Sequence, residues 1–214
     1  MGALNCVGMY GRSVTKDATA PKWFTDTEAG HSERYVEYIR GLAADGADLG
    51  GEARFMDALM APRSRVLDAG CGPGRVGAVL HQRGHHVVGV DVDPVLIAAA
   101  REDHPDVTWV VSDLVELDLK SLGEVEPFDA AVLAGNVLAF VAPDSEVHAL
   151  RGVGRHLRSG GRAVVGFQTE RYSVADFDSH LAEAGFELEQ RFATWDLRPW
   201  HSDADFVVSV LLWS

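Results

Sequence analysis

A short apolar run, an acid, a glycine-rich turn and an amphipathic stretch follow one another between Val66 and Leu80. The run Val-Leu-Asp-Ala-Gly-Cys-Gly-Pro-Gly-Arg-Val-Gly starts at Val66, and Val76, Val79 and Leu80 fit one face of a helix. The glycines remove side-chain bulk from the turn, and the helix that follows offers free backbone N–H groups. This order predicts a strand, a tight turn and a helix that together cradle a nucleotide-like ligand.

Strand and helix patterns alternate along the chain after this stretch. The expected strands are 65–68, 86–91, 107–112, 128–134 and 162–168. The expected helices are 73–83, one from Asp93-Pro94 to before Pro105, one capped by Asp144 that runs past Leu157 to Gly160-Gly161, and one from Ser173 to Gly185. Such alternation predicts an α/β fold with a mostly parallel sheet and helices on both faces.

The last two expected strands depart from the alternation. Residues 186–196 and 204–213 follow each other without a helix between them, which predicts an antiparallel hairpin. The final strand is apolar on both sides, so we place it inside the sheet beside 162–168. The charged strand 186–196 then takes the edge.

The segment before the alternation carries a different pattern. Residues 1 to about 30 show no clear period and predict an arm, with Trp23 and Phe24 packing onto the domain or lining a substrate mouth. Two helices follow, one from Ser32 and one that Pro62 ends. We therefore divide the chain into 1–60, an arm with two helices, and 61–214, a ligand-binding domain.

The composition narrows the range of possible functions. The 214 residues carry 19 basic and 32 acidic side chains, a net charge of −13, which disfavours nonspecific nucleic-acid binding. The sequence shows no signal-peptide pattern and no apolar run of transmembrane length, so we expect a cytoplasmic protein without a membrane partner. Cys6 and Cys71 predict neither a disulfide framework nor a metal site, and Cys71 is expected to fill space beside the ligand.

Four groups of residues stand at the carboxyl ends of successive expected strands. They are Asp68 with Gly70, Gly72 and Gly74; Asp91 with Val92; Asp113 with Leu114; and Gly135 with Asn136. Each group alone fits a structural role as well as a ligand contact, because glycine turns and acidic helix caps are common. Together they indicate one ligand site, since ligands bind outside the carboxyl ends of strands in open α/β sheets.

A nicotinamide dinucleotide is the rival ligand. Residues 72–77 match G-x-G-x-x-G, and Asp91 lies 19 residues beyond Gly72. Asp68 argues against it, because a carboxylate beside a pyrophosphate is unfavourable. Tyr172 is followed four residues later by Asp176 and not by a lysine, so the chain offers no evident hydride-transfer apparatus. An adenosine linked to an amino acid fits the acids better.

With these motifs the sequence resembles the class I S-adenosylmethionine-dependent methyltransferases. The matching segments are 66–77, 90–93, 112–114, 128–133 and 157–162. The resemblance implies S-adenosylmethionine as cofactor and a Rossmann-like sheet of order 3-2-1-4-5-7-6 with strand 7 antiparallel. It implies that Asp68 faces the ammonium and Asp91 the ribose, that Asp113, Leu114 and Val92 hold the adenine, and that Gly135 or Asn136 lies at the methionine end. Gly70, Gly72 and Gly74 would line the methionine and ribose. The helices before residue 60 resemble the variable N-terminal helices of the family, which often form part of a lid.

The expected activity is methyl transfer to an unidentified small molecule. Asn136 is not followed by Pro-Pro-aromatic, and no Pro-Cys pair follows strand 128–134, so the sequence lacks two patterns of DNA methyltransferases. The candidates for the acceptor site lie outside the cofactor motifs and are His31, Tyr35, Tyr38, Phe140, Tyr172, Trp195, Trp200 and His201. The catalytic candidates among them are His31, Tyr172 and His201. A dinucleotide-dependent oxidoreductase and a non-catalytic S-adenosylmethionine-binding module stay as alternatives, and the oligomeric state stays open.

Overall fold

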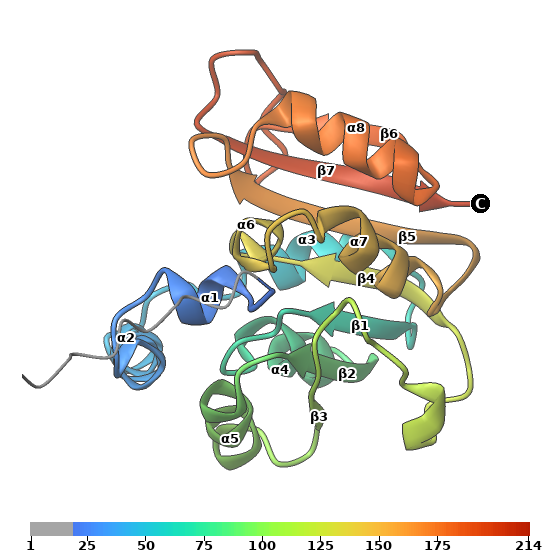
Figure 1. The fold of residues 1–214 in the computed structure, drawn as a ribbon. Helices are drawn as coiled ribbons and strands as arrows, with labels where there is room; N and C mark the ends of the chain where they lie inside the picture. The colour runs from blue at the N-terminus through green and yellow to red at the C-terminus, as the bar shows by residue number, and fades with distance from the viewer. Residues whose placement is uncertain (1–18) are drawn as a thin grey trace, which may run out of the picture.

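The structure is a computed structural model and describes residues 19–214. Its centre is a seven-stranded sheet of order β3-β2-β1-β4-β5-β7-β6 (Figure 1). The strands are β1 Arg65–Ala69, β2 His86–Asp91, β3 Thr108–Val111, β4 Phe128–Leu133, β5 Leu157–Gln168, β6 Phe186–Phe192 and β7 Phe206–Trp213. The strand order and the predicted hairpin are confirmed.

Strand β1 is the centre of the parallel part. Its Val66 lies opposite Val87 of β2 on one side and opposite Ala130 of β4 on the other. The strand order reverses at this point, so the carboxyl ends of β1 and β4 border the crevice in which α/β sheets bind ligands. Strand β7 pairs antiparallel with both β5 and β6. Its apolar residues are buried, which is why it lies inside the sheet and the charged β6 at the edge.

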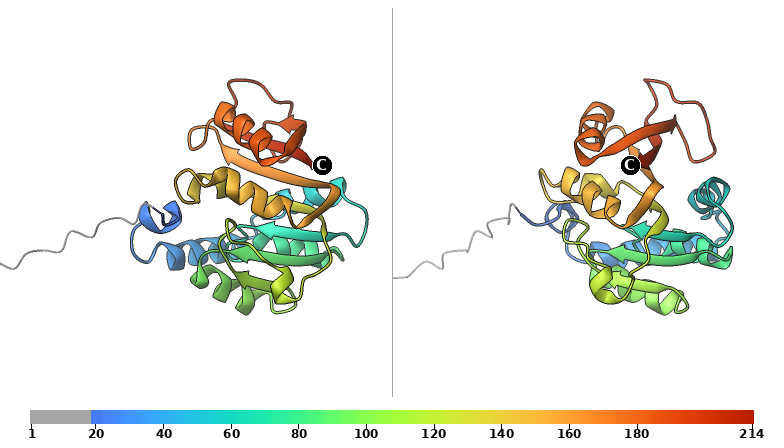
Figure 2. Two further views of the ribbon diagram at one scale, coloured as in Figure 1. Left: turned by 45° about the vertical axis from the view of Figure 1, so that its right-hand side comes forward. Right: turned by 90° about the vertical axis from the view of Figure 1, so that its right-hand side faces the viewer.

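Helices cover both faces of the sheet (Figure 2). They are α1 Lys22–Thr25, α2 His31–Ala44, α3 Gly51–Leu59, α4 Arg75–Gln82, α5 Pro94–Asp103, α6 Val137–Phe140, α7 Glu146–Gly154 and α8 Val174–Ala184, with a 3-10 turn η1 at Lys120–Leu122. One core cluster joins α3, α4 and α5 to the sheet, and the other joins α7 and α8 to its opposite face. None of the described helices is long and apolar enough to cross a membrane. The expected arm falls largely on residues 1–18, outside the described part.

The prediction for residues 144–161 is partly wrong. Helix α7 begins at Glu146 and ends at Gly154, whereas Asp144 has a φ of 61° and does not cap it. Leu157 already belongs to β5, where it pairs with Phe128. The register then shifts, with Gly160 at a φ of 71°, so the two glycines form an irregularity within a strand and do not close a helix.

Gly152 sets how closely α7 approaches the loop after β3. A Cβ there would lie 1.9 Å from the backbone oxygen of Leu114. We expect Gly152→Ala to destabilise the fold by about 2 kcal/mol, because a backbone atom cannot move aside as the end of a flexible side chain can. Gly41 of α2 is the control, since a Cβ there meets nothing within 4 Å. Gly41→Ala should stabilise by about 0.5 kcal/mol, and urea unfolding of both variants measures the difference.

Candidate cofactor site

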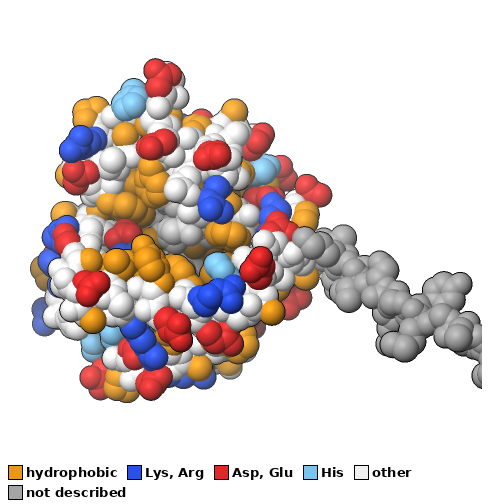
Figure 3. Space-filling view, turned by 90° about the vertical axis from the view of Figure 1, so that its left-hand side faces the viewer, with side chains coloured by type: hydrophobic (Ala, Val, Ile, Leu, Met, Phe, Trp, Pro, Cys, Tyr) orange, Lys and Arg blue, Asp and Glu red, His pale blue; other side chains and the backbone are white. Residues whose placement is uncertain are grey.

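A pocket of about 910 Å³, its mouth included, lies at the carboxyl ends of β1, β2, β3 and β4. Figure 3 shows this face of the molecule hollowed, with hydrophobic side chains on both sides of the hollow. Helices α1 and α2 lie off the same edge of the sheet (Figure 1). The predicted residues that line the pocket are Asp68, Gly70, Gly72, Asp91, Val92, Asp113, Leu114 and Gly135. The structure therefore brings together residues from all four predicted groups.

The glycine turn is fastened to β2 by its backbone. The N–H groups of Gly70 and Cys71 both donate to the carbonyl oxygen of Val90, at 2.7 and 2.9 Å. Gly70 and Gly72 have φ values of 77° and 55°, which favour glycine. Gly74, also predicted for the site, does not line the pocket. It begins α4 in the left-handed conformation, with the Trp109 ring where a Cβ would stand.

Asp91 ends β2 with its carboxylate held in place. One oxygen accepts the Gly72 N–H at 2.8 Å and the other accepts the Asp93 N–H at 2.9 Å. Burial raises the pKa of Asp91 to about 6, against the lowering effect of these hydrogen bonds. Each carboxylate oxygen has a second lone-pair position. Asp91 can therefore accept two further hydrogen bonds from adjacent hydroxyl groups.

Asp68, near the end of β1, is a buried carboxyl to which no cationic side chain of residues 19–214 is bonded. It is 1% exposed, and the Gly77 N–H donates to its Oδ2 at 2.8 Å. Burial raises its pKa to about 7. The nearby Arg75 lowers that pKa, but its guanidinium is already held in two hydrogen bonds by Glu52 and in another by the Leu49 carbonyl. A ligand cation beside Asp68 would offset the cost of burying its charge.

The ends of β3 and β4 complete the pocket differently from each other. After β3, Asp113 accepts the Val115 N–H at 2.9 Å, and Leu114 is buried beside it. After β4, Gly135 lines the pocket but Asn136 does not. The Asn136 side chain instead accepts the Gln168 N–H at 2.7 Å, so it fastens the turn to the end of β5.

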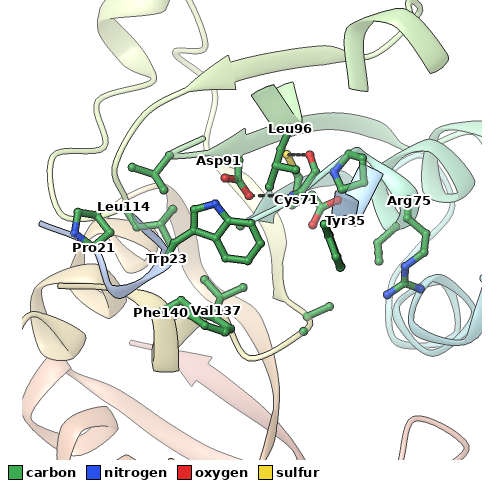
Figure 4. A pocket seen from close by; sticks show the side chains of 18 of the residues that line it. Pro21, Trp23, Tyr35, Cys71, Arg75, Asp91, Leu96, Leu114, Val137 and Phe140 are labelled. Carbon is green, nitrogen blue, oxygen red and sulfur yellow. Dashed lines mark hydrogen bonds between the residues drawn. The ribbon is translucent and has the colours of Figure 1, made fainter. Parts of the chain in front are cut away.

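Sequence reasoning missed an aromatic cluster centred on Trp23. The Trp23 ring meets those of His31, Tyr35 and Phe140 edge-on, with centroids 4.8, 5.9 and 5.5 Å apart. Trp23, Tyr35 and Phe140 line the pocket, and Figure 4 shows Trp23 beside Asp91 and Phe140. The sequence names all four side chains, Trp23 as an aromatic residue that packs onto the domain or lines a mouth and the other three as candidates outside the cofactor motifs. It does not reveal that their rings meet.

The three catalytic candidates lie apart from the pocket lining. His31 touches Trp23 but is not among the residues that line the pocket. Tyr172 is buried against Phe167 and Phe177, and its hydroxyl is 2.5 Å from Nδ1 of His180. Burial raises the pKa of Tyr172 above its ordinary value. His201 is exposed in the loop between β6 and β7.

The polar side chains that line this pocket fit S-adenosylmethionine better than a dinucleotide. A pyrophosphate needs donors free of nearby negative charge, yet Asp68 lines the pocket with the glycine turn, and the lining arginine, Arg75, is paired with Glu52. An ammonium matches Asp68, a pair of ribose hydroxyls matches Asp91, and Leu114 offers an apolar surface for a base. No group of three metal-ligating side chains occurs within residues 19–214.

Comparisons with known proteins agree with this chemistry. A family model described as "Methyltransferase domain" matches residues 66–161. A solved TehB-like SAM-dependent methyltransferase of Corynebacterium glutamicum is 41% identical, with a TM-score of 0.81, over 87% of this chain and 100% of that chain.

Two curated relatives are more distant. The arsenite methyltransferase of Halobacterium salinarum is 30% identical over 94% of this chain, and the ribosomal protein L11 methyltransferase of Symbiobacterium thermophilum is 32% identical over 62%. The matched parts span 59% and 42% of those two relatives. The fold, the pocket and the match to the whole of the Corynebacterium chain lead to one assignment: the chain belongs to the class I S-adenosylmethionine-dependent methyltransferases.

Proposed function

We propose that the protein transfers a methyl group from S-adenosylmethionine to a small molecule, with the pocket at the ends of β1, β2, β3 and β4 as the cofactor site. The observation that carries the proposal is the pair of buried acids, Asp68 and Asp91, which line one pocket. One backbone N–H holds the Asp68 carboxyl and two hold that of Asp91. When bound, the cofactor supplies a methyl group already activated on a sulfonium.

Each residue that the sequence predicted for the site then has a proposed role. Asp68 pairs with the ammonium, Asp91 accepts the ribose hydroxyls, and Gly70 and Gly72 let the backbone approach the ligand. Asp113, Leu114 and Val92 hold the adenine, and Gly135 lies at the methionine end. We assign Asn136 and Gly74 to shaping the turns on either side, because their contacts point there.

The acceptor side of the pocket is apolar and poor in bases. Trp23, Val137, Phe140 and Val141 line it, and no histidine is among the described lining residues. Burial raises the pKa of Tyr35 and that of the Cys71 thiol, so neither is a ready base near neutral pH. Such a site holds and orients reactants and excludes water. It suits a nucleophile with a free lone pair, such as a neutral amine, better than an alcohol that needs a base.

The pocket and the charge argue for a small acceptor and against larger partners. Within segment 1–60, α1 and α2 serve as the cover, since Trp23, Tyr35 and Ile39 line the pocket. Helix α3 packs on the sheet with the cofactor-binding part, 61–214. The net charge of −13 disfavours a nucleic-acid acceptor. A soft metalloid held by several thiolates does not fit a chain whose cysteines are Cys6 and a buried Cys71. A cytoplasmic location stays a prediction from the sequence.

Two measurements test the proposal. Calorimetry should detect binding of S-adenosylmethionine and of S-adenosylhomocysteine but not of NAD, and binding of NAD alone would overturn the cofactor assignment. A panel of small amines, thiols and alcohols is then assayed for released S-adenosylhomocysteine. We expect turnover with members of the amine or thiol groups. Cofactor binding without turnover on any acceptor would favour the non-catalytic binding module.

A further inference from the structure

Helix α1 crosses the mouth of the pocket and is attached on both sides of it. On the β4 side, the Lys22 N–H donates to the Val141 carbonyl at 3.3 Å, and Lys22 Nζ lies 3.4 Å from Glu146. On the β2 side, the attachment point is Asp93. Since β2 and β4 flank β1 on opposite sides, the helix spans the crevice at which the strand order reverses (Figure 1).

The attachment at Asp93 is the tighter of the two. Nε1 of Trp23 donates to Oδ2 of Asp93 at 2.7 Å, and the hydroxyl of Ser32 donates to the same oxygen. The other oxygen caps α5 by accepting the Val95 N–H at 2.8 Å. Asp93 is 1% exposed, so its hydrogen bonds compete little with water. The Lys22–Glu146 pair is longer, and Lys22 is about one-third exposed.

The Asp93 attachment is also connected to the proposed ribose acid. The Asp93 N–H donates to Oδ1 of Asp91 at 2.9 Å, and the Gly72 N–H donates to Oδ2 of the same carboxylate. In the view of Figure 4 the Trp23 indole lies between Asp91 on one side and Phe140 and Val137 on the other. One chain of hydrogen bonds therefore runs from the covering helix, through Asp93 and Asp91, to the glycine turn.

We propose that the hydrogen bonds from Trp23 and Ser32 to Asp93 latch α1 over the pocket and set the rate at which the cofactor and its product enter and leave. The inference rests on the proposed cofactor site. Trp23 lines the same pocket as Asp91 and Leu114. Because α1 is attached on two sides of this pocket, the helix leaves Asp93 to admit a ligand. Because the latch donors belong to the arm and Asp93 keeps its capping role, the latch opens without unfolding α5.

The test uses the double variant Trp23→Phe/Ser32→Ala in the full chain. It removes both donors but keeps an aromatic ring at residue 23 and leaves Asp93 as the α5 cap. Stopped-flow fluorescence with S-adenosylhomocysteine should show association and dissociation rates that both rise about tenfold, while Kd changes less than either rate. Thr25→Ala is the matched control, because the Thr25 hydroxyl donates to Asp26 within the arm and not across the pocket. Its rates should equal those of the wild type.

Hydrogen exchange gives a readout that does not depend on the ligand. Backbone amides of residues 22–32 should exchange faster in the double variant than in the wild type and in Thr25→Ala. Unchanged exchange and unchanged rates would overturn the latch. A raised Kd with an unchanged association rate would also overturn it, since Trp23 would then be a ligand contact alone. If the wild type binds no S-adenosylhomocysteine, the proposed cofactor site fails, and the exchange result separately shows whether the latch holds the arm.

Discussion

Asp91→Ala is expected to lower the affinity for S-adenosylmethionine at least 100-fold, about 2.7 kcal/mol. The proposal gives this carboxylate two hydrogen bonds from ribose hydroxyls, each strengthened by its negative charge. The substitution also leaves the Gly72 and Asp93 N–H groups without their acceptor. The turn that faces the ligand then loses its alignment as well. Isothermal titration calorimetry measures the affinity, and circular dichroism checks that the variant is folded.

Asp129→Ala is the matched control for this experiment. Asp129 also accepts a backbone N–H, that of Arg65 at 2.8 Å, and it pairs with Arg158. It lies at the start of β4, on the edge of the sheet opposite to the pocket. Its loss should reduce stability and leave cofactor affinity unchanged. An Asp91→Ala protein that is folded and binds S-adenosylmethionine as tightly as the wild type would remove Asp91 from the site.

The sheet could be predicted because its strands carry strong local signals. β2 and β4 are short apolar runs bounded by turn residues, and Asp93-Pro94 marks the start of α5 with a cap and a proline that the structure confirms. The apolar sequence of β7 on both faces placed it inside the sheet. These signals lie within a few residues of the structure they specify, so one sequence is enough to reveal them.

The cover of the pocket could not be predicted in the same way. Helices α1 and α6 have four residues each, too short for any hydrophobic period to appear. Tyr35 has the spacing of an ordinary buried helix position, yet α2 directs it towards the glycine turn at Gly72. Its contact with Trp23, and that of Phe140, depend on how three helices meet in space.

The misread region has a physical cause as well. Gly160 and Gly161 after an amphipathic stretch fit the end of a helix, but the pairing of Leu157 with Phe128 extends β5 back past them. A backbone pairing between segments about 30 residues apart gives no signal in the local sequence. Gly74 and Asn136 were likewise predicted as ligand contacts from their positions in the sequence alone. Whether each residue faces the pocket depends on its neighbours in the fold, which are Trp109 for Gly74 and Gln168 for Asn136.

Asp68 connects function to stability through its protonation. Its folded-state pKa of about 7 lies above the ordinary value of 3.8, so the folded protein binds this proton more tightly than the unfolded chain does. The contribution of Asp68 to stability is fully present below pH 3.8 and is lost as the pH rises through about 7. An ammonium bound beside it favours the charged form and reverses that loss. If Asp68 holds the ammonium as proposed, the acid costs stability in the free protein and contributes affinity for the cofactor.

Asp68→Asn should therefore separate the two effects. The amide oxygen can still accept the Gly77 N–H, and no charge is buried. At pH 8 we expect the melting temperature of the free protein to rise by roughly 3 °C, with the gain shrinking to zero as the pH falls from about 7 to 3.8. Calorimetry should show an affinity for S-adenosylmethionine lowered about 30-fold, because the ammonium loses its counter-charge. Asp48→Asn is the control: the Arg54 guanidinium lowers the pKa of this exposed carboxyl to about 2, so its loss should not stabilise at pH 8. A variant with wild-type affinity and no gain in melting temperature would show that Asp68 is neither the ammonium partner nor a buried charge near neutral pH.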